Sequence, residues 1–228
     1  MKKLTLFFLS ICLLATFSLH AQKKFTGVIQ FKTKIEGTDD PNLVSSIESM
    51  TTMVSILGNK SKTVQVFQDG NISVTSIWDG DKGAAMNIIE ITGMGKFYKK
   101  TTAEEHQENL KLSETKINYV DEYKTILDYK CQKVEITVTD LEDDSTKELI
   151  LYVTKEIGGP KINGEQYPDL EGLALLTLMP LPQYCDECMM AVEAVKITAK
   201  KIKDVDFMLP ADAKNIDEEP EMKEMLGW

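Results

Sequence analysis

The Cys185-Asp-Glu-Cys188 motif is the one stretch of this sequence whose residue types and spacing resemble a chemical site. Two cysteines at this spacing occur in dithiol oxidoreductases, where a helix N-terminus lowers a thiol pKa. Here the motif follows two prolines, Pro180 and Pro182, and precedes an expected strand. The two acidic residues inside it raise thiol pKa values. The motif therefore favours a structural role over redox catalysis.

Zinc binding is the next chemistry to weigh for the same cysteines. Beyond residue 21, the chain has three cysteines, Cys131, Cys185 and Cys188, and one histidine, His106. A tetrahedral zinc site needs four nitrogen or sulfur ligands, so all four residues would have to converge from distant segments. A disulfide is favoured instead in an exported protein, either within the Cys185–Cys188 pair or from one of them to Cys131. An odd count leaves one thiol unpaired.

Other catalytic and metal-binding patterns are not found in the sequence. The acidic turn at residues 140–145 lacks the spacing and the glycine of a calcium loop. The Asp79-Gly80-Asp81 segment is typical of a hairpin turn. No G-x-S-x-G, H-E-x-x-H or P-loop motif occurs. We therefore expect a protein that is not an enzyme and that has no cofactor and no metal.

The charge composition disfavours two classes of partner. The chain has 228 residues with 26 basic and 36 acidic side chains, a net charge of −10, and every basic residue is lysine. Arginine supplies the planar, bidentate contacts to phosphates and bases that lysine does not replace. An acidic protein without arginine is a poor candidate for binding nucleic acid or anionic lipid surfaces.

The first 21 residues have the pattern of a secretory signal peptide. Two lysines precede an apolar run over residues 4–19, which is shorter than the ~20 residues that a membrane span needs. The small residue Ala21 ends a cleavage pattern, so we expect a periplasmic or secreted chain that begins at Gln22. Cys12 lies inside the apolar run instead of ending it, which disfavours a lipid anchor. No other stretch is apolar enough to span a bilayer.

Residues 115–157 predict the central strands of the fold. Val134, Ile136 and Val138 alternate with polar residues, which is the pattern of a strand with one buried face. A polar turn at residues 140–145 then leads to an apolar strand at residues 149–153. Counting from Val134, Cys131 falls on the opposite face of its strand.

The rest of the chain predicts a single mainly β (α+β) domain over residues 22–228. Further strands are expected at residues 25–35, 63–68, 72–78, 84–91, 96–100, 173–179, 189–203 and 207–210, with Asp69-Gly70 as one hairpin turn. Short helices are expected at residues 41–49, 102–110 and 218–226. Residues 50–57 fit a strand or a longer helix, and their β-branched residues favour the strand. Gly27 is interpreted as a bulge position. The total is about 10 to 11 mostly antiparallel strands with two or three helices.

Several strands are apolar on both faces, so each face must be covered. A curved sheet whose concave side holds helices meets this need, and so does a cavity that holds an apolar ligand. The chain has 11 methionines, which suit a deformable apolar lining. An ordinary packed core is the simpler interpretation of the same pattern.

The motif KTILDYKCQKV at residues 124–134 resembles the K-T-I-x-G-Y-K-C-x-K-A core of an envelope family, domain of unknown function 4412. Further agreements, in the same order, are FTGVI at 25–29, GNK at 58–60, LYVTKEI at 151–157, LEGL at 170–173, and Asp206-Phe207 with Pro210. That family is similar to the LolA/LolB-like lipoprotein-carrier superfamily. The resemblance implies an incomplete antiparallel barrel, or half-barrel, with helices closing over an apolar cavity that accepts acyl chains.

Two departures from the family pattern bear on this expectation. Asp128 stands where the family often has glycine, and aspartate accepts the left-handed conformation of a turn. The lack of arginine excludes an arginine contact to a lipid headgroup, which weakens a strict lipoprotein-carrier role. The function expected first is that of an exported, non-enzymatic envelope protein that binds a lipid or other apolar ligand. The alternatives are an envelope assembly module with a packed core, and a thiol or zinc protein that uses Cys185 and Cys188. The sequence leaves open the ligand, the partner and the oligomeric state.

Overall fold

The computed structural model describes residues 25–67 and 70–228. The expected signal peptide, Cys12, the cleavage position before Gln22 and Asp69 of one expected hairpin turn lie outside these residues. Within the described residues, the chain forms one sheet of twelve strands with three α-helices and three short 3-10 helices.

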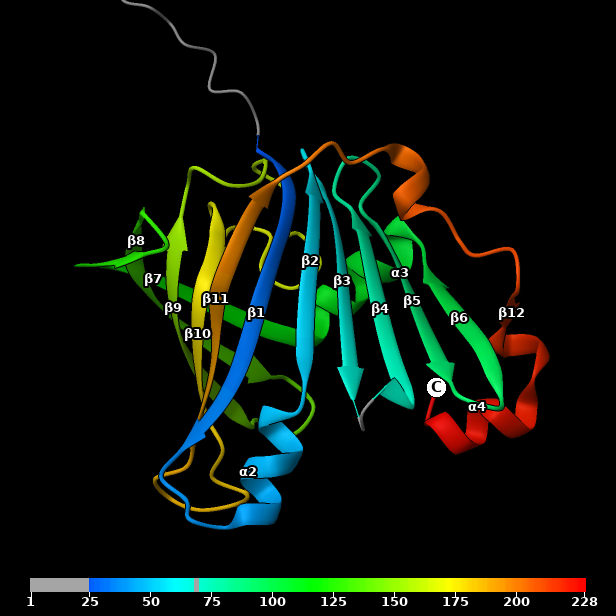
Figure 1. The fold of residues 1–228 in the computed structure, drawn as a ribbon, viewed down its shortest axis with the longest axis horizontal. Helices are drawn as coiled ribbons and strands as arrows, with labels where there is room; N and C mark the ends of the chain where they lie inside the picture. Colours follow the sequence, from blue (N-terminus) through cyan, green and yellow to red (C-terminus); the bar gives the residue numbers. More distant parts are fainter. Residues whose placement is uncertain (1–24, 68–69) are drawn as a thin grey trace, which may run out of the picture.

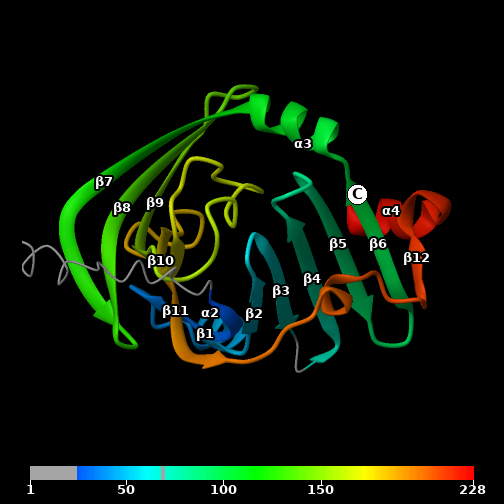
Figure 2. The ribbon, with the colours of Figure 1, turned by 90° about the horizontal axis from the view of Figure 1, so that it is seen from above.

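The strands form one open sheet in the order β12-β6-β5-β4-β3-β2-β1-β11-β10-β9-β8-β7. Their bounds are β1 (Thr26–Glu36), β2 (Thr51–Leu57), β3 (Lys60–Phe67), β4 (Ile72–Asp79), β5 (Ala84–Ile91), β6 (Gly95–Thr101), β7 (Ser113–Ile126), β8 (Tyr129–Asp140), β9 (Thr146–Thr154), β10 (Leu173–Pro180), β11 (Met189–Ala199) and β12 (Ala213–Asn215). Figure 2 shows the sheet bent into an arc whose two edge regions do not meet. The expectation of a mainly β, curved and unclosed sheet is confirmed.

Two of the three helices begin where the sequence predicts. In α2 (Pro41–Glu48), the side chain of Asp40 accepts hydrogen bonds from the backbone N–H groups of Asn42 and Leu43. In α3 (Ala103–Asn109), Thr102 and Glu105 form the predicted capping box. The third helix, α4 (Pro220–Leu226), starts two residues later than expected. Residues 51–57 form β2, as their β-branched residues favoured.

The end of the chain differs from the prediction. The expected edge strand at residues 207–210 is wrong, because Asp204–Phe207 form a 3-10 helix and the edge strand is β12, parallel to β6. Phe207 and Leu209 pack on Ile77, Met86 and Ile88 of β4 and β5. The apolar residues of this segment therefore cover the sheet face instead of extending its edge. With β12 included, the strand count is twelve instead of 10 to 11.

Gly27 is not the bulge position. The register of β1 against β11 shifts between Gln30 and Phe31. A Cβ atom at Gly27 would lie 2.3 Å from the carbonyl oxygen of Thr198 in β11. Glycine is required there because the two backbones approach closely.

The β7–β8 turn has the left-handed conformation that the sequence predicts at Asp128. Both Leu127 (φ 47°) and Asp128 (φ 70°) take positive φ values.

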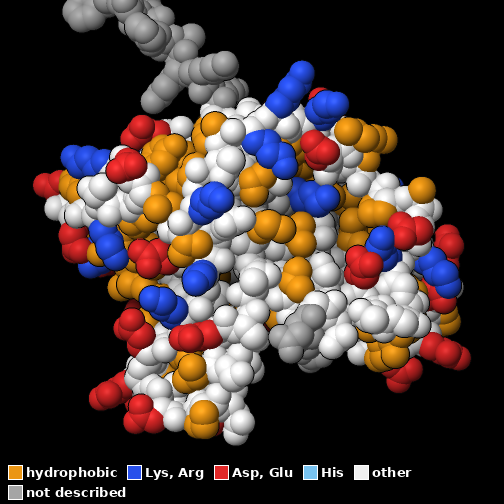
Figure 3. Space-filling model, in the orientation of Figure 1, with side chains coloured by type: hydrophobic (Ala, Val, Ile, Leu, Met, Phe, Trp, Pro, Cys, Tyr) orange, Lys and Arg blue, Asp and Glu red, His pale blue; other side chains and the backbone are white. Residues whose placement is uncertain are grey.

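The concave side of the arc is occupied by chain segments as well as side chains. Figure 2 shows the connection between β9 and β10, residues 155–172, lying inside the arc, and α3 crossing its open side from β6 to β7. We call residues 155–172 the cavity loop. In Figure 1, α2 lies below the middle of the sheet, where β1 ends and β2 begins, beside the β10–β11 loop. The convex face carries lysine and acidic side chains intermixed with scattered apolar ones (Figure 3).

Candidate functional site

The cavity loop is attached to the β2–β3 turn by backbone contacts. The N–H of Gly159 donates to the carbonyl oxygen of Gly58 at 2.9 Å. The N–H of Lys161 donates to Oδ1 of Asn59 at 3.4 Å. A Cβ atom at Gly159 would lie 2.0 Å from the same Asn59 oxygen, so a side chain at this position would displace the Asn59 amide. The start of the cavity loop is therefore held across the arc from β9.

Two buried aromatic side chains hold the middle of the cavity loop. Trp78 donates from Nε1 to the carbonyl oxygen of Lys161 at 2.7 Å. His106 of α3 donates from Nε2 to the carbonyl oxygen of Gly164 at 2.8 Å. The two rings also contact each other, with centroids 4.9 Å apart. A Cβ atom at Gly164 would lie 2.6 Å from the Trp78 ring. The loop thus joins β4 and α3 through its own backbone.

The end of the cavity loop is closed by one amide side chain. Nδ2 of Asn163 donates to the carbonyl oxygens of Leu170 (2.9 Å) and Gly172 (2.5 Å). Leu170 is buried against Val134, Ile136 and neighbouring residues of β8 and β9. Residues 163–172 therefore form a compact lobe that packs on the apolar side chains of β8 and β9.

Two adjoining cavities remain between the sheet, α3 and the cavity loop. The outer cavity has a volume of about 1190 Å³ and is lined by residues of β5, β7–β10, α3 and the cavity loop. The inner cavity has a volume of about 350 Å³ and lies against β1–β3 and β9–β11. Five residues line both cavities: Leu149, Glu165, Gln166, Tyr167 and Met179.

The inner cavity combines an apolar wall with a row of hydroxyl groups. Strand pairing places Val54 opposite Thr63, so both face the concave side. The wall residues also include the apolar residues Phe31, Leu151, Leu173 and Val192, the hydroxyl-bearing residues Ser61, Thr63 and Thr177, and Thr52. Thr52 is 6% exposed, and its Oγ1 has no hydrogen-bond partner among the described residues. A buried hydroxyl without a partner is unfavourable, and this oxygen has almost no accessible surface, so it is not presented to the cavity that its residue lines.

Glu165 is the acidic group of this site. It is the one charged residue among those lining the inner cavity, and it lines the outer cavity as well. Its carboxylate makes no hydrogen bond or ion pair with any described residue. Burial raises the pKa of Glu165, and the neighbouring His106 partly offsets that rise. The site therefore presents a desolvated carboxylate to the cavities.

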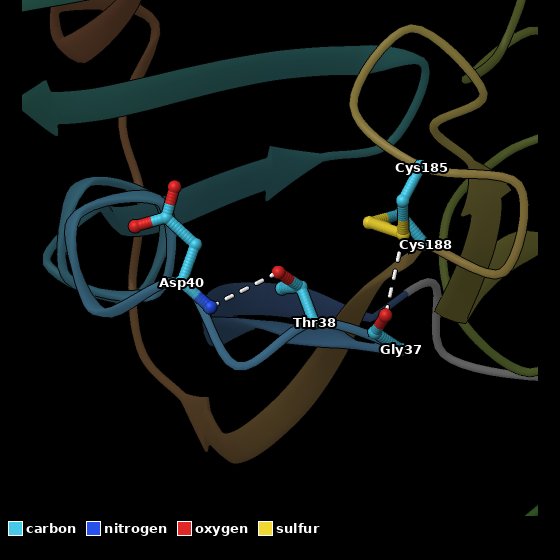
Figure 4. The surroundings of a disulfide bond; sticks show 5 residues. All are labelled: Gly37, Thr38, Asp40, Cys185 and Cys188. Carbon is cyan, nitrogen blue, oxygen red and sulfur yellow. Dashed lines mark hydrogen bonds between the residues drawn. A yellow bond between two sulfur atoms is a disulfide. The ribbon is translucent and has the colours of Figure 1, made fainter.

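The cysteine motif lies in the β10–β11 loop, at the ends of strands in the middle of the arc. Cys185 and Cys188 form a disulfide, with Cα atoms 5.1 Å apart. Figure 4 shows Sγ of Cys185 facing the carbonyl oxygen of Gly37, at a distance of 3.2 Å. Cys188 is buried with Ile35 and Leu181, and helix α2 packs against the same cluster. The disulfide closes a tight turn within the β10–β11 loop, and the burial of Cys188 anchors this turn beside the β1–α2 connection.

The other two candidate zinc ligands, Cys131 and His106, lie away from the disulfide and in different parts of the fold. Cys131 is a free cysteine with no exposed surface, and burial raises the pKa of its thiol to about 11. It packs with Ile29 and Ile157, in a different cluster from Val134 and from the disulfide. His106 contacts Trp78 and Gly164. In the described part of the chain, no three His, Cys, Asp or Glu residues are grouped so that they could hold a metal ion.

The cavity-lining residues differ from those that the sequence singled out. Thr52, Glu165 and Tyr167 carry no recognisable motif. The alternation of β2 places Thr52 on the same face as Val54, which was a usable signal for its burial. For Glu165, the sequence offered only a Gly- and Pro-containing loop, which is compatible with many surface loops.

No helix in the described residues is both long and apolar enough to cross a membrane. No family model matches this sequence, and no curated protein sequence is significantly similar to it.

Proposed function

We propose that this protein is an exported, non-enzymatic envelope protein that binds an apolar or amphipathic ligand, such as a lipid, on the concave side of its sheet. The observation that carries the proposal is the inner cavity of about 350 Å³, which opens beside an outer cavity of about 1190 Å³. Binding sites for small molecules are concave, largely apolar and about 300–1,000 Å³ in volume, with a few polar groups that orient the ligand.

The lining of the inner cavity supports a ligand with an apolar part. Phe31, Leu151 and Val192 present apolar surface that a hydrocarbon chain would remove from water, at roughly 25 cal/mol per Å² buried. Met179 lines both cavities and has a flexible, polarizable side chain that adapts to irregular ligands. The resemblance of residues 124–134 to the envelope family, and through it to the LolA/LolB-like superfamily, supports the same class of ligand.

A cavity-filling variant tests this proposal. Thr63 lines the inner cavity from the middle of β3, so Thr63→Trp would occupy the ligand's space. Met53→Trp is the matched control, because Met53 is 43% exposed on the neighbouring strand β2 and does not line either cavity. We expect native mass spectrometry to find a co-purified acyl-type molecule on the wild type and on Met53→Trp, and much less on Thr63→Trp. Equal ligand content in all three proteins, or none in the wild type after gentle purification, would contradict the proposal.

A second candidate function is that of an envelope assembly module. Its supporting observation is β7, a strand of 14 residues that ends the sheet order and has no strand on its outer side within the described residues. An exposed edge strand can add a strand from a partner. A defined complex in envelope extracts that forms equally well with wild type and Thr63→Trp would favour this function over ligand binding.

A further inference from the structure

We propose that the ligand of the two cavities carries a protonated amine, which the carboxylate of Glu165 binds. The inference rests on the proposed ligand-binding function and adds the chemical class of the ligand's polar group. It follows from the charges that face the cavities, from the missing partner of the Glu165 carboxylate, and from the joint lining of the two cavities.

The charges around the cavities favour a cation. Among the described residues, Glu165 is the one charged residue that lines the inner cavity. Beyond Glu165, the outer cavity is lined by four titratable side chains of the described residues, those of His106, Lys147, Glu148 and Tyr167. His106 uses its Nε2 hydrogen on the Gly164 carbonyl, and Lys147 and Glu148 are exposed at the start of β9. An anionic headgroup in the inner cavity would meet a carboxylate of the same sign, and no lysine of the described residues lines that cavity.

The missing partners favour a donor group. A carboxylate is only an acceptor when ionised, and Glu165 receives no hydrogen bond from a described residue. Leaving such a group desolvated and unpaired is unfavourable, whereas a charge-assisted hydrogen bond is about twice as strong as a neutral one. An ammonium group supplies both the opposite charge and three donors. A neutral alcohol supplies a single donor and no charge.

The joint lining explains how one ligand would use both cavities. Leu149, Tyr167 and Met179 line the inner and outer cavities, and Glu165 does as well. An amine held at Glu165 would leave its hydrocarbon chain against these shared apolar side chains. The proposed ligand is thus an amphiphile with a cationic head, in contrast to a fatty acid.

Calorimetric titration of the purified protein with three ten-carbon probes tests the inference. Decylamine, decanol and decanoate share one chain and differ in the head group, and at pH 7 decylamine is in its ammonium form. We expect decylamine to bind at least about tenfold more tightly than decanol, and decanoate to bind most weakly of the three. In Glu165→Gln, the ratio of the decylamine and decanol affinities should fall close to one. Glu108→Gln removes one exposed negative charge from α3 outside both cavities, so the tenfold ratio should persist there.

The outcomes separate this inference from the proposed function. If decanol and decanoate bind as tightly as decylamine, the protein binds apolar chains but the cationic head is wrong. The same holds if Glu165→Gln keeps the preference for decylamine while its near-UV circular dichroism matches the wild type. If none of the three probes binds, the ligand-binding function itself is overturned, and this inference with it. The wild-type series alone decides the head group if Glu165→Gln does not fold.

Discussion

Nε2 of His106 donates a hydrogen bond of 2.8 Å to the carbonyl oxygen of Gly164, the residue that immediately precedes Glu165. This bond joins α3, which crosses the open side of the arc, to the loop that divides the two cavities (Figure 2). His106 is 5% exposed and its ring contacts Trp78, which holds the same loop through Lys161. The position of Glu165 therefore depends on a contact between two segments that are distant in the sequence.

His106→Ala should destabilise the protein by about 2–3 kcal/mol. The variant loses one buried hydrogen bond, leaves the Gly164 carbonyl without a donor and creates a cavity beside Trp78. The free energy of unfolding from urea titration, followed by tryptophan fluorescence, measures the effect. Gln107→Ala changes the neighbouring exposed residue of α3 and should stay within about 0.5 kcal/mol of the wild type. Similar stabilities for both variants would show that the contact contributes little.

Glu165→Gln should stabilise the unliganded protein at neutral pH. The pKa of this carboxyl group is raised in the folded state by burial, so the unfolded chain releases its proton at a lower pH than the native protein does. The protonated Glu165 side chain therefore contributes stability that is fully present below the pKa of this group in the unfolded chain. This contribution is lost as the pH rises through the pKa of the same group in the folded protein. The gain over the wild type should be clear at pH 7 and should shrink toward pH 4. Urea unfolding at a series of pH values checks this, and a pH-independent difference would contradict it.

Cys131 should be inert in the native protein. Its thiol has no exposed surface, and its pKa is raised to about 11, so the reactive thiolate is scarce below pH 9. In protein that lacks residues 1–21, a thiol reagent at pH 8 should label no cysteine under native conditions and one after unfolding without reductant. Because the thiol pKa is raised in the folded protein, the protonated Cys131 contributes stability at every pH below the thiol pKa of the unfolded chain. This contribution is lost as the pH rises toward the thiol pKa of the folded protein. Fast labelling of the native protein would contradict this burial.

Reduction of the Cys185–Cys188 disulfide should destabilise the protein by about 2 kcal/mol. The bond closes a loop of only four residues, and the chain-entropy relation gives a small effect for such short loops. The midpoint of urea unfolding should fall on addition of a phosphine reductant. The double variant Cys185→Ser/Cys188→Ser should show the lower midpoint with or without reductant. A wild-type midpoint that does not respond to reductant would contradict the prediction.

Local patterns predicted most of the secondary structure. Alternation of Val134, Ile136 and Val138 predicted β8, and the caps at Asp40 and Thr102 predicted the starts of α2 and α3. These features depend on neighbours within a few residues, so the sequence alone contains them. The expected edge strand at residues 207–210 failed for the opposite reason, since Phe207 and Leu209 pack on an apolar surface that only the assembled sheet provides.

The residues of the candidate site could not be predicted from local patterns, for the same reason. The cysteine motif predicted a structural disulfide or a chemical centre, and the chain pairs Cys185 with Cys188 away from both Cys131 and His106. Glycine at position 27 was identified as special for the wrong reason, because the contact with Thr198 is made by a strand that lies far along the chain.

The sequence by itself determined the charge of this protein, its mainly β character and the two-sided apolar strands that require cover on both faces. The tertiary structure alone decided what provides that cover: the segment with Phe207 on the convex side, and the cavity loop with α3 on the concave side. It also decided that Thr52 and Glu165 line one cavity. The physical reason is that strand alternation sets the face of a side chain, whereas the partner of that face is set by long-range packing of the whole sheet.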